Sequence, residues 1–113
     1  MLNIELEYKR GILFLRLNGI LNSQTSFILE DAIKNIVNKA GIKYLLINFE
    51  KLEELDKYGI NTIINSYNHY LKDRGKLMIC GYDNLSVNIL KSDLIKYAST
   101  TINEVSAFNL INI

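Results

Sequence analysis

Apolar and polar residues alternate from Leu2 to Tyr8, with the period expected of a strand that buries one face. The segment from Ile12 to Leu17 is dense in apolar residues, and Lys9-Arg10-Gly11 between the two is a turn signal. The pattern therefore predicts a β-hairpin, whose second strand is expected to close at Asn18-Gly19.

Two stripes of apolar residues then follow at helical spacing. The first lies within 27–40, after the N-cap candidates Asn22 and Ser23 and before Gly41, a residue type that favours a left-handed helix end. The second is followed by Gly75 and consists of Ile60, Ile63, Ile64, Tyr67 and Leu71. Each stripe predicts one helix.

Two short, continuous apolar runs, 44–49 and 76–80, are typical of central strands covered on both faces. A charged connection over 50–54 is expected after the first run. The remaining segment, 83–113, has weaker signals. They predict a third helix from Asp83 or Asn84 to about Lys91, an edge strand within 97–101, and a last helix capped by Asn103.

Strands that alternate with helices indicate an α/β fold with right-handed crossovers. The expected sheet is mixed but mostly parallel, with four to five strands and about four helices. A length of 113 residues and an apolar content of 49% fit a single domain, residues 1–113, around one core.

Charge and apolar runs narrow the classes of function. Thirteen Lys and Arg against twelve Asp and Glu give no electrostatic basis for binding nucleic acid. No apolar run approaches the roughly 20 residues that cross a membrane. The single cysteine cannot form an internal disulfide, and a cytoplasmic location is the default expectation.

Candidate catalytic groups are few. His69 is expected on the helix surface and Cys80 in the core, so neither suggests a metal site or a reactive thiol. The glycines are isolated and form no phosphate-binding loop, and the acids over 50–56 are interspersed with Lys51 and Lys57. We therefore expect no enzyme activity, no cofactor and no metal.

The most informative feature is Asp56-Lys57-Tyr58-Gly59 at the start of the second helix, where Asp56 can cap free backbone N–H groups. The segment 46–60 is similar to the central motif of the STAS domain family, an apolar strand and short loop before Asp-Ser-Ser-Gly-Leu or Asp-Ser-Thr-Gly-Leu. Segments 17–25, 74–80 and 104–108 resemble, in order, the family's Leu-x-Gly-Glu-Leu-Asp-x-x-Thr motif, its Gly-Gly-x-Leu-x-Leu strand and its closing acidic helix.

The resemblance implies a STAS-type fold and the function of a bacterial anti-sigma factor antagonist. Such proteins bind an anti-sigma factor that is a serine kinase, and binding releases the sigma factor for transcription. The contact surrounds the start of the second helix, and the kinase reverses it by phosphorylating the residue after the motif Asp. The partner-binding residues implied here are Asp56, Lys57, Tyr58 and Gly59, with Asn22, Ser23 and Thr25 adjacent.

The sequence departs from the family pattern at this site. Lys57 stands at the phosphoacceptor position and cannot be phosphorylated, while Ile20 and Asn22 replace two family acids. Two hypotheses remain: an anti-sigma factor antagonist without the usual switch, or a STAS scaffold or small-ligand module in a signalling or transport assembly. An exposed patch with Leu55 and Tyr58 would also allow a homodimer.

Overall fold

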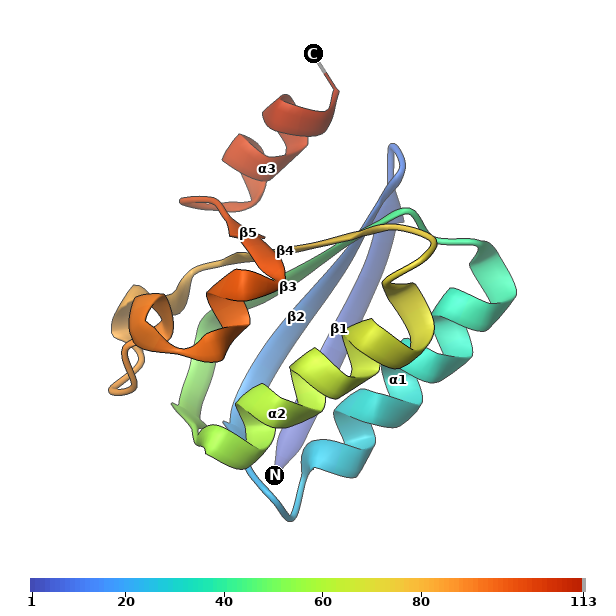
Figure 1. Cartoon of the computed structure of the whole chain (residues 1–113). Helices are drawn as coiled ribbons and strands as arrows, with labels where there is room; N and C mark the ends of the chain where they lie inside the picture. The colour runs from blue at the N-terminus through green and yellow to red at the C-terminus, as the bar shows by residue number, and fades with distance from the viewer. Residues whose placement is uncertain (113) are drawn as a thin grey trace.

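The computed structural model describes residues 1–112, which form a five-stranded sheet in the order β1-β2-β3-β4-β5 (Figure 1). Strand β1 is antiparallel to β2, and every other neighbouring pair is parallel. The strands are β1 (Leu2–Lys9), β2 (Ile12–Leu21), β3 (Tyr44–Leu55), β4 (Lys76–Cys80) and β5 (Ala98–Thr100). The predicted α/β class and mostly parallel sheet are confirmed.

Helices cover the two faces of the sheet unequally. Helix α1 (Ser26–Ala40) and helix α2 (Lys57–Ser66) lie side by side on one face, and α2 continues into a π-helical turn, η1 (Tyr67–Leu71). Helix α3 (Glu104–Ile111) contacts the other face (Figure 1). The described residues thus form three α-helices, against about four predicted.

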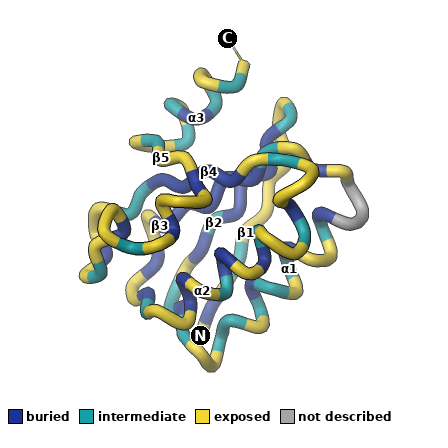
Figure 2. Tube along the Cα trace, viewed as in Figure 1, coloured by how far each residue is buried: buried dark blue, intermediate teal, exposed yellow. Residues whose placement is uncertain are grey.

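The period of two along the strands divides the core into two clusters. On β2, Leu13, Leu15 and Leu17 face the cluster beneath α1 and α2, whereas Ile12 and Phe14 face the smaller cluster near α3. All five side chains are buried, which explains the continuous apolar run in the sequence. Figure 2 shows the buried residues concentrated along the central strands.

Both central strands are longer than predicted. Strand β2 runs through Asn18-Gly19 and pairs with β3 as far as Leu21 opposite Leu55, so Asn18-Gly19 does not close the strand. The predicted charged connection over 50–54 is likewise part of β3. In this half of β3, Glu50, Lys51, Glu53 and Glu54 are exposed and only Leu52 and Leu55 are buried, and the register with β2 shifts between Gly19 and Ile20.

The third predicted helix is wrong. Three short 3₁₀ turns occupy this region: η2 (Tyr82–Asn84), η3 (Ile89–Lys91) and η4 (Asp93–Lys96). The side chains of Asn88 and Ser92 accept hydrogen bonds from the N–H groups of Leu90 and Leu94, so each caps a separate turn and interrupts a continuous helix. The edge strand within 97–101 and the Asn103-capped last helix are confirmed.

Candidate functional site

The candidate site lies where β2 and β3 end together. Their last register pair joins Leu21 and Leu55, and the N–H of Asp56 donates to the carbonyl of Leu21 over 3.4 Å. The loops that follow the two strands therefore begin side by side. In open α/β sheets this carboxyl edge is where binding surfaces commonly form.

Asp56 is the N-cap of α2, as predicted. Its backbone is extended, its side chain is half-buried, and its Oδ1 accepts a hydrogen bond of 2.9 Å from the N–H of Gly59. The carboxylate also lies at the positive end of the helix dipole. One side chain thus fixes where α2 begins.

Gly59 brings α2 close to the strand ends. A Cβ on this residue would lie 2.8 Å from Leu21 Cγ, 2.8 Å from Leu55 Cδ1 and 2.9 Å from the Leu21 carbonyl oxygen. A larger residue would force the helix or the strand ends to shift. Gly59 therefore permits a close approach between α2 and the ends of β2 and β3.

Lys57 and Tyr58 project from this fixed start into solvent. Tyr58 is 53% exposed, and the Lys57 ammonium lies 5.4 Å from the centroid of the Tyr58 ring. This spacing permits a cation–π contact. Leu55 is only 6% exposed, so the predicted exposed patch of Leu55 and Tyr58 is wrong in its first member.

The neighbouring loop is held by its own side chains. Asn22 Oδ1 accepts from the N–H groups of Gln24 and Thr25, while Thr25 Oγ1 donates to the Ile20 carbonyl and accepts from the Asn22 N–H. Asn22 therefore caps this turn, while α1 itself starts only at Ser26, with Thr25 and not Asn22 or Ser23 as its N-cap. Ser23 is exposed on the loop.

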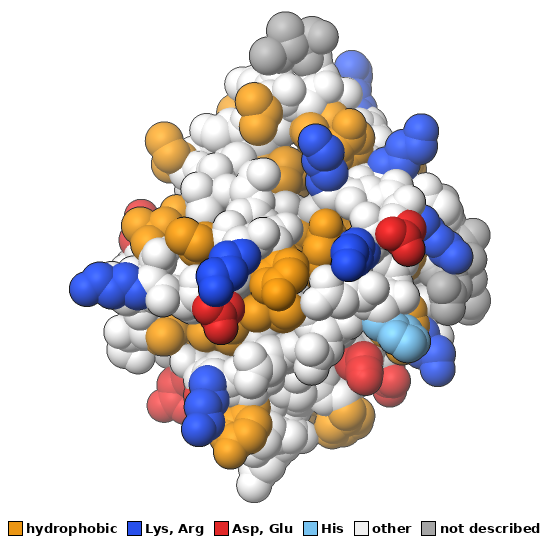
Figure 3. All heavy atoms as spheres, viewed as in Figure 1, with side chains coloured by type: hydrophobic (Ala, Val, Ile, Leu, Met, Phe, Trp, Pro, Cys, Tyr) orange, Lys and Arg blue, Asp and Glu red, His pale blue; other side chains and the backbone are white. Residues whose placement is uncertain are grey.

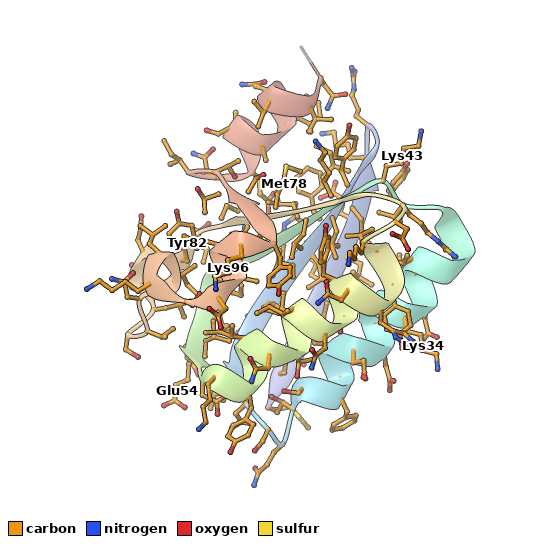
Figure 4. All side chains as sticks on the ribbon, viewed as in Figure 1. Lys34, Lys43, Glu54, Met78, Tyr82 and Lys96 are labelled. Atoms are coloured by element: carbon orange, nitrogen blue, oxygen red, sulfur yellow. The ribbon has the colours of Figure 1, made fainter. Side chains whose placement is uncertain are left out.

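The surroundings of the site carry charges of both signs. Glu54, labelled in Figure 4, is exposed at the end of β3, just before the Asp56 turn. On the face shown in Figure 3, apolar, basic and acidic side chains are interspersed, with no area of a single charge. The arrangement is a preformed polar and aromatic surface, without a cluster of catalytic groups.

A second polar cluster, which the sequence did not predict, lies on the face of the sheet that α3 covers. Arg16 Nε and Nη2 each donate to Glu104 over 2.8 Å, and Arg16 also donates to Glu5 over 2.6 Å and to Glu7 over 2.9 Å. Asn48 Nδ2 donates to Glu104 over 2.7 Å. The available signal was Arg16 itself, the one charged residue in the apolar run of β2.

The cluster has clear electrostatic consequences. Hydrogen bonds from Arg16, followed by that from Asn48, lower the pKa of Glu104 against the opposing effect of burial. Hydrogen bonding to Glu104 raises the pKa of Arg16. Both side chains therefore stay charged, and they fasten the first turn of α3 to the sheet.

Cys80 lies beside this cluster, and both line a surface cavity of about 410 Å³. Burial, reinforced by the charges of Glu104 and Glu50, raises the pKa of the Cys80 thiol to about 12. The thiol is therefore protonated at neutral pH and a poor nucleophile. Cys80 is buried at the end of β4, as predicted.

The remaining sequence candidates lie apart. His69 is exposed on η1, with its ring edge-on to Tyr70 at 4.7 Å. Within residues 1–112, no group of three or more His, Cys, Asp and Glu side chains could hold a metal ion. In the same part of the chain, no helix is both long enough and apolar enough to cross a membrane.

Comparison with known proteins gives consistent results. The chain is 25% identical, over 113 residues, to an anti-sigma F factor antagonist of Paenibacillus polymyxa, covering 99% of this chain and 97% of the relative. Its structure is similar to an anti-sigma factor antagonist from Mycobacterium paratuberculosis, with a TM-score of 0.81, 18% identity and coverage of 100% and 96%.

It is also similar to the anti-sigma factor antagonist SpoIIAA in its unphosphorylated form, with a TM-score of 0.75, 16% identity and coverage of 98% and 100%. These structural likenesses show a shared fold. The family model described as "STAS domain" matches residues 3–89, most of the chain. The chain therefore belongs to the STAS domain family, as a member that resembles the anti-sigma factor antagonists.

Proposed function

We propose that this protein is a non-enzymatic, cytoplasmic regulator that binds an anti-sigma factor of the serine-kinase type and so influences sigma-factor-dependent transcription. The observation that carries the proposal is the exposed pair Lys57 and Tyr58 at a rigidly capped helix start. The named function of the Paenibacillus relative supports the choice of partner.

The geometry suits recognition of a protein surface. The Asp56 cap and the packing of Gly59 hold Lys57 and Tyr58 in place before binding, so less conformational entropy is lost on association. Tyrosine is also enriched among residues that dominate binding energy. The loop of Asn22, Ser23 and Thr25 would complete the contact.

The proposal includes the loss of one switch. SpoIIAA has been solved in both an unphosphorylated and a phosphorylated form. At the position that matches the family's phosphoacceptor, this chain has Lys57. A phosphate would add about −1.5 to −2 charges, whereas Lys57 has a side-chain amine with no hydroxyl to phosphorylate, so binding would persist without reversal at this position.

The contact is tested by calorimetry with a purified serine-kinase anti-sigma factor encoded beside the gene. Tyr58→Ala is expected to weaken binding at least about thirtyfold, because loss of a central aromatic contact typically costs about 2 kcal/mol or more. Leu110→Ala is the matched control, since Leu110 is 60% exposed but lies on α3, which packs on the other face of the sheet.

Equal binding by both variants would reject the proposed surface. If a pull-down from the native cell recovers only transport or sensor proteins, the scaffold function is favoured instead.

The loss of the phosphorylation switch needs a separate experiment, in which the protein is incubated with the kinase and ATP and analysed by mass spectrometry. We expect no phosphate on the Asp56 turn or the 22–25 loop, and a gain of one phosphate in Lys57→Ser. Phosphate on Ser23 or Tyr58 of the unaltered protein would contradict loss of the switch.

A further inference from the structure

Strand β1 forms a long, open edge of the sheet. Within residues 1–112, β2 is the only strand that pairs with β1, and every residue from Glu5 to Arg10 is exposed. Edge strands are usually protected by proline, bulges, short length or charged side chains. The charged residues of β1, Glu5, Glu7 and Lys9, all lie on one face of the strand. Strand β1 has eight residues, contains no proline and pairs with β2 in unbroken register.

The hairpin turn determines which backbone groups face outward. Arg10 and Gly11 have φ of 51° and 85°, as in a type I′ turn, and Lys9 pairs with Ile12. Such a turn closes on a hydrogen-bonded pair, and bonded pairs then occur at every second residue. The bond from the Ile20 N–H to the Met1 carbonyl fits this alternation.

Odd-numbered residues of β1 therefore bond to β2. The N–H and C=O groups of the even-numbered residues Ile4, Leu6 and Tyr8 point away from the sheet, where another strand could pair with them. The side chains of these three residues lie on the face that carries α1. Leu6 is 42% exposed and Tyr8 is 61% exposed, so an incoming strand would find apolar surface to cover.

The other face of β1 is acidic. The side chains of Glu5 and Glu7 are 68% and 47% exposed, and both contact Arg16. Arg16 also pairs with Glu104, so one positive charge meets three carboxylates and a net charge of −2 remains on the cluster. Lys9, the next residue on this face, lies at the hairpin end.

We propose that the free edge of β1 binds an extended segment of another protein in which apolar residues alternate with Lys or Arg. Backbone hydrogen bonds would form at Ile4, Leu6 and Tyr8. The apolar side chains of the segment would cover Leu6 and Tyr8, and its basic side chains would face Glu5 and Glu7. This is recognition by strand addition, with side chains on alternate faces supplying specificity.

A second copy of this chain fits the edge less well. Antiparallel pairing centred on Leu6 aligns the two apolar stripes, but it sets Glu5 of one copy directly opposite Glu7 of the other. Pairing centred on Glu7 brings Glu5 opposite Lys9, but it sets the two Glu7 side chains directly opposite each other. Like charges directly opposite each other destabilise a strand pair. A basic segment of a different protein removes this repulsion.

The test uses the full chain, labelled with ¹⁵N, and a peptide of about eight residues that alternates valine and lysine. We expect shift changes at the amides of Ile4, Leu6 and Tyr8, and little binding of the same peptide with glutamate in place of lysine. Glu7→Lys is expected to weaken binding about two- to tenfold, because a cross-strand charge pair becomes repulsive.

Leu6→Pro removes an outward N–H without removing a bond to β2, and edge strands tolerate proline. It is expected to abolish binding while melting close to the unaltered protein. Leu6→Lys, which keeps the N–H but sets a charge against the apolar side chains of the peptide, tests the same edge independently, and Leu110→Lys on α3 is the matched control. Equal binding of the lysine and glutamate peptides, or shift changes away from β1, would overturn the proposal. So would a dimer that Leu6→Pro disrupts without any peptide binding.

Discussion

Arg16 on β2 and Glu104 on α3 are 88 positions apart in the sequence and are joined by two hydrogen bonds of 2.8 Å. The two side chains are only about a quarter exposed, at 26% and 24%. Two parallel bonds between a guanidinium and a carboxylate restrict both distance and angle. The pair therefore sets the position of α3, the only α-helix among the described residues on that face of the sheet.

Replacement of Glu104 should destabilise the protein far more than replacement of Glu7. Glu104→Ala removes both bonds from Arg16 and leaves Asn48 Nδ2 without its acceptor, so we expect a loss of about 1.5–3 kcal/mol. Glu7 makes one bond and its side chain is 47% exposed, so Glu7→Ala should cost less than about 1 kcal/mol. Urea denaturation of both variants measures the difference, and equal losses would contradict this role for Glu104.

The same carboxylate should make stability depend on acid pH. The pKa of Glu104 is lowered in the folded protein, chiefly by the hydrogen bonds from Arg16, whereas an unfolded glutamate has a pKa of about 4.3. Its stabilising contribution is therefore complete above that value and is lost as the pH falls through the folded pKa.

We therefore expect the free energy of unfolding to fall between about pH 5 and pH 3, and to fall less steeply in Glu104→Gln, which cannot ionise there. Denaturant melts of both proteins across this range provide the measurement. Parallel curves for the two proteins would show that other carboxylates account for the acid sensitivity.

Cys80 should resist thiol reagents while the protein is folded. Its burial raises the thiol pKa to about 12, and only the thiolate is reactive. At pH 8, labelling with a chromogenic disulfide should be slow in buffer and complete in denaturant. Ser23→Cys places a thiol at an exposed position, so this variant is the control and its new thiol should react at once.

Regular periodicity made the sheet and its two main helices predictable from sequence. The predicted elements were wrong where the local residue pattern and the long-range contacts favour different structures. The charged residues over 50–54 resemble a loop, but their partners on β2 extend the strand pair to Leu21 and Leu55. That pairing depends on long-range contacts, which a local pattern does not contain. Likewise, a helix was expected from Asp83 or Asn84 to about Lys91, yet Asn88 and Ser92 cap separate short turns in this region.

The candidate site was predicted more fully than the Arg16 cluster. Asp56 has a local signature, a cap residue type at a helix start, and it acts as expected. Arg16 and Glu104 carry no such signature, because neither residue type nor spacing shows that β2 and α3 will meet. Burial of Leu55 was missed for a related reason: its neighbours in sequence are charged, but it faces the core.

The Asp56 cap should be separable from the Asp56 charge. Asp56→Ala removes the acceptor for the Gly59 N–H and should cost about 0.5–2 kcal/mol. Asp56→Asn keeps a side-chain oxygen in the same place, and asparagine ranks with aspartate as a cap, so it should lose only the smaller dipole contribution of about 0.3–1 kcal/mol. Thermal or urea unfolding distinguishes the two. If both variants lose the same stability, the charge and not the hydrogen bond fixes the start of α2. If Asp56→Asn loses less stability than Asp56→Ala, the hydrogen bond fixes the start of α2 and so positions Lys57 and Tyr58. Partner binding measured with Asp56→Asn then reports the effect of the carboxylate charge alone.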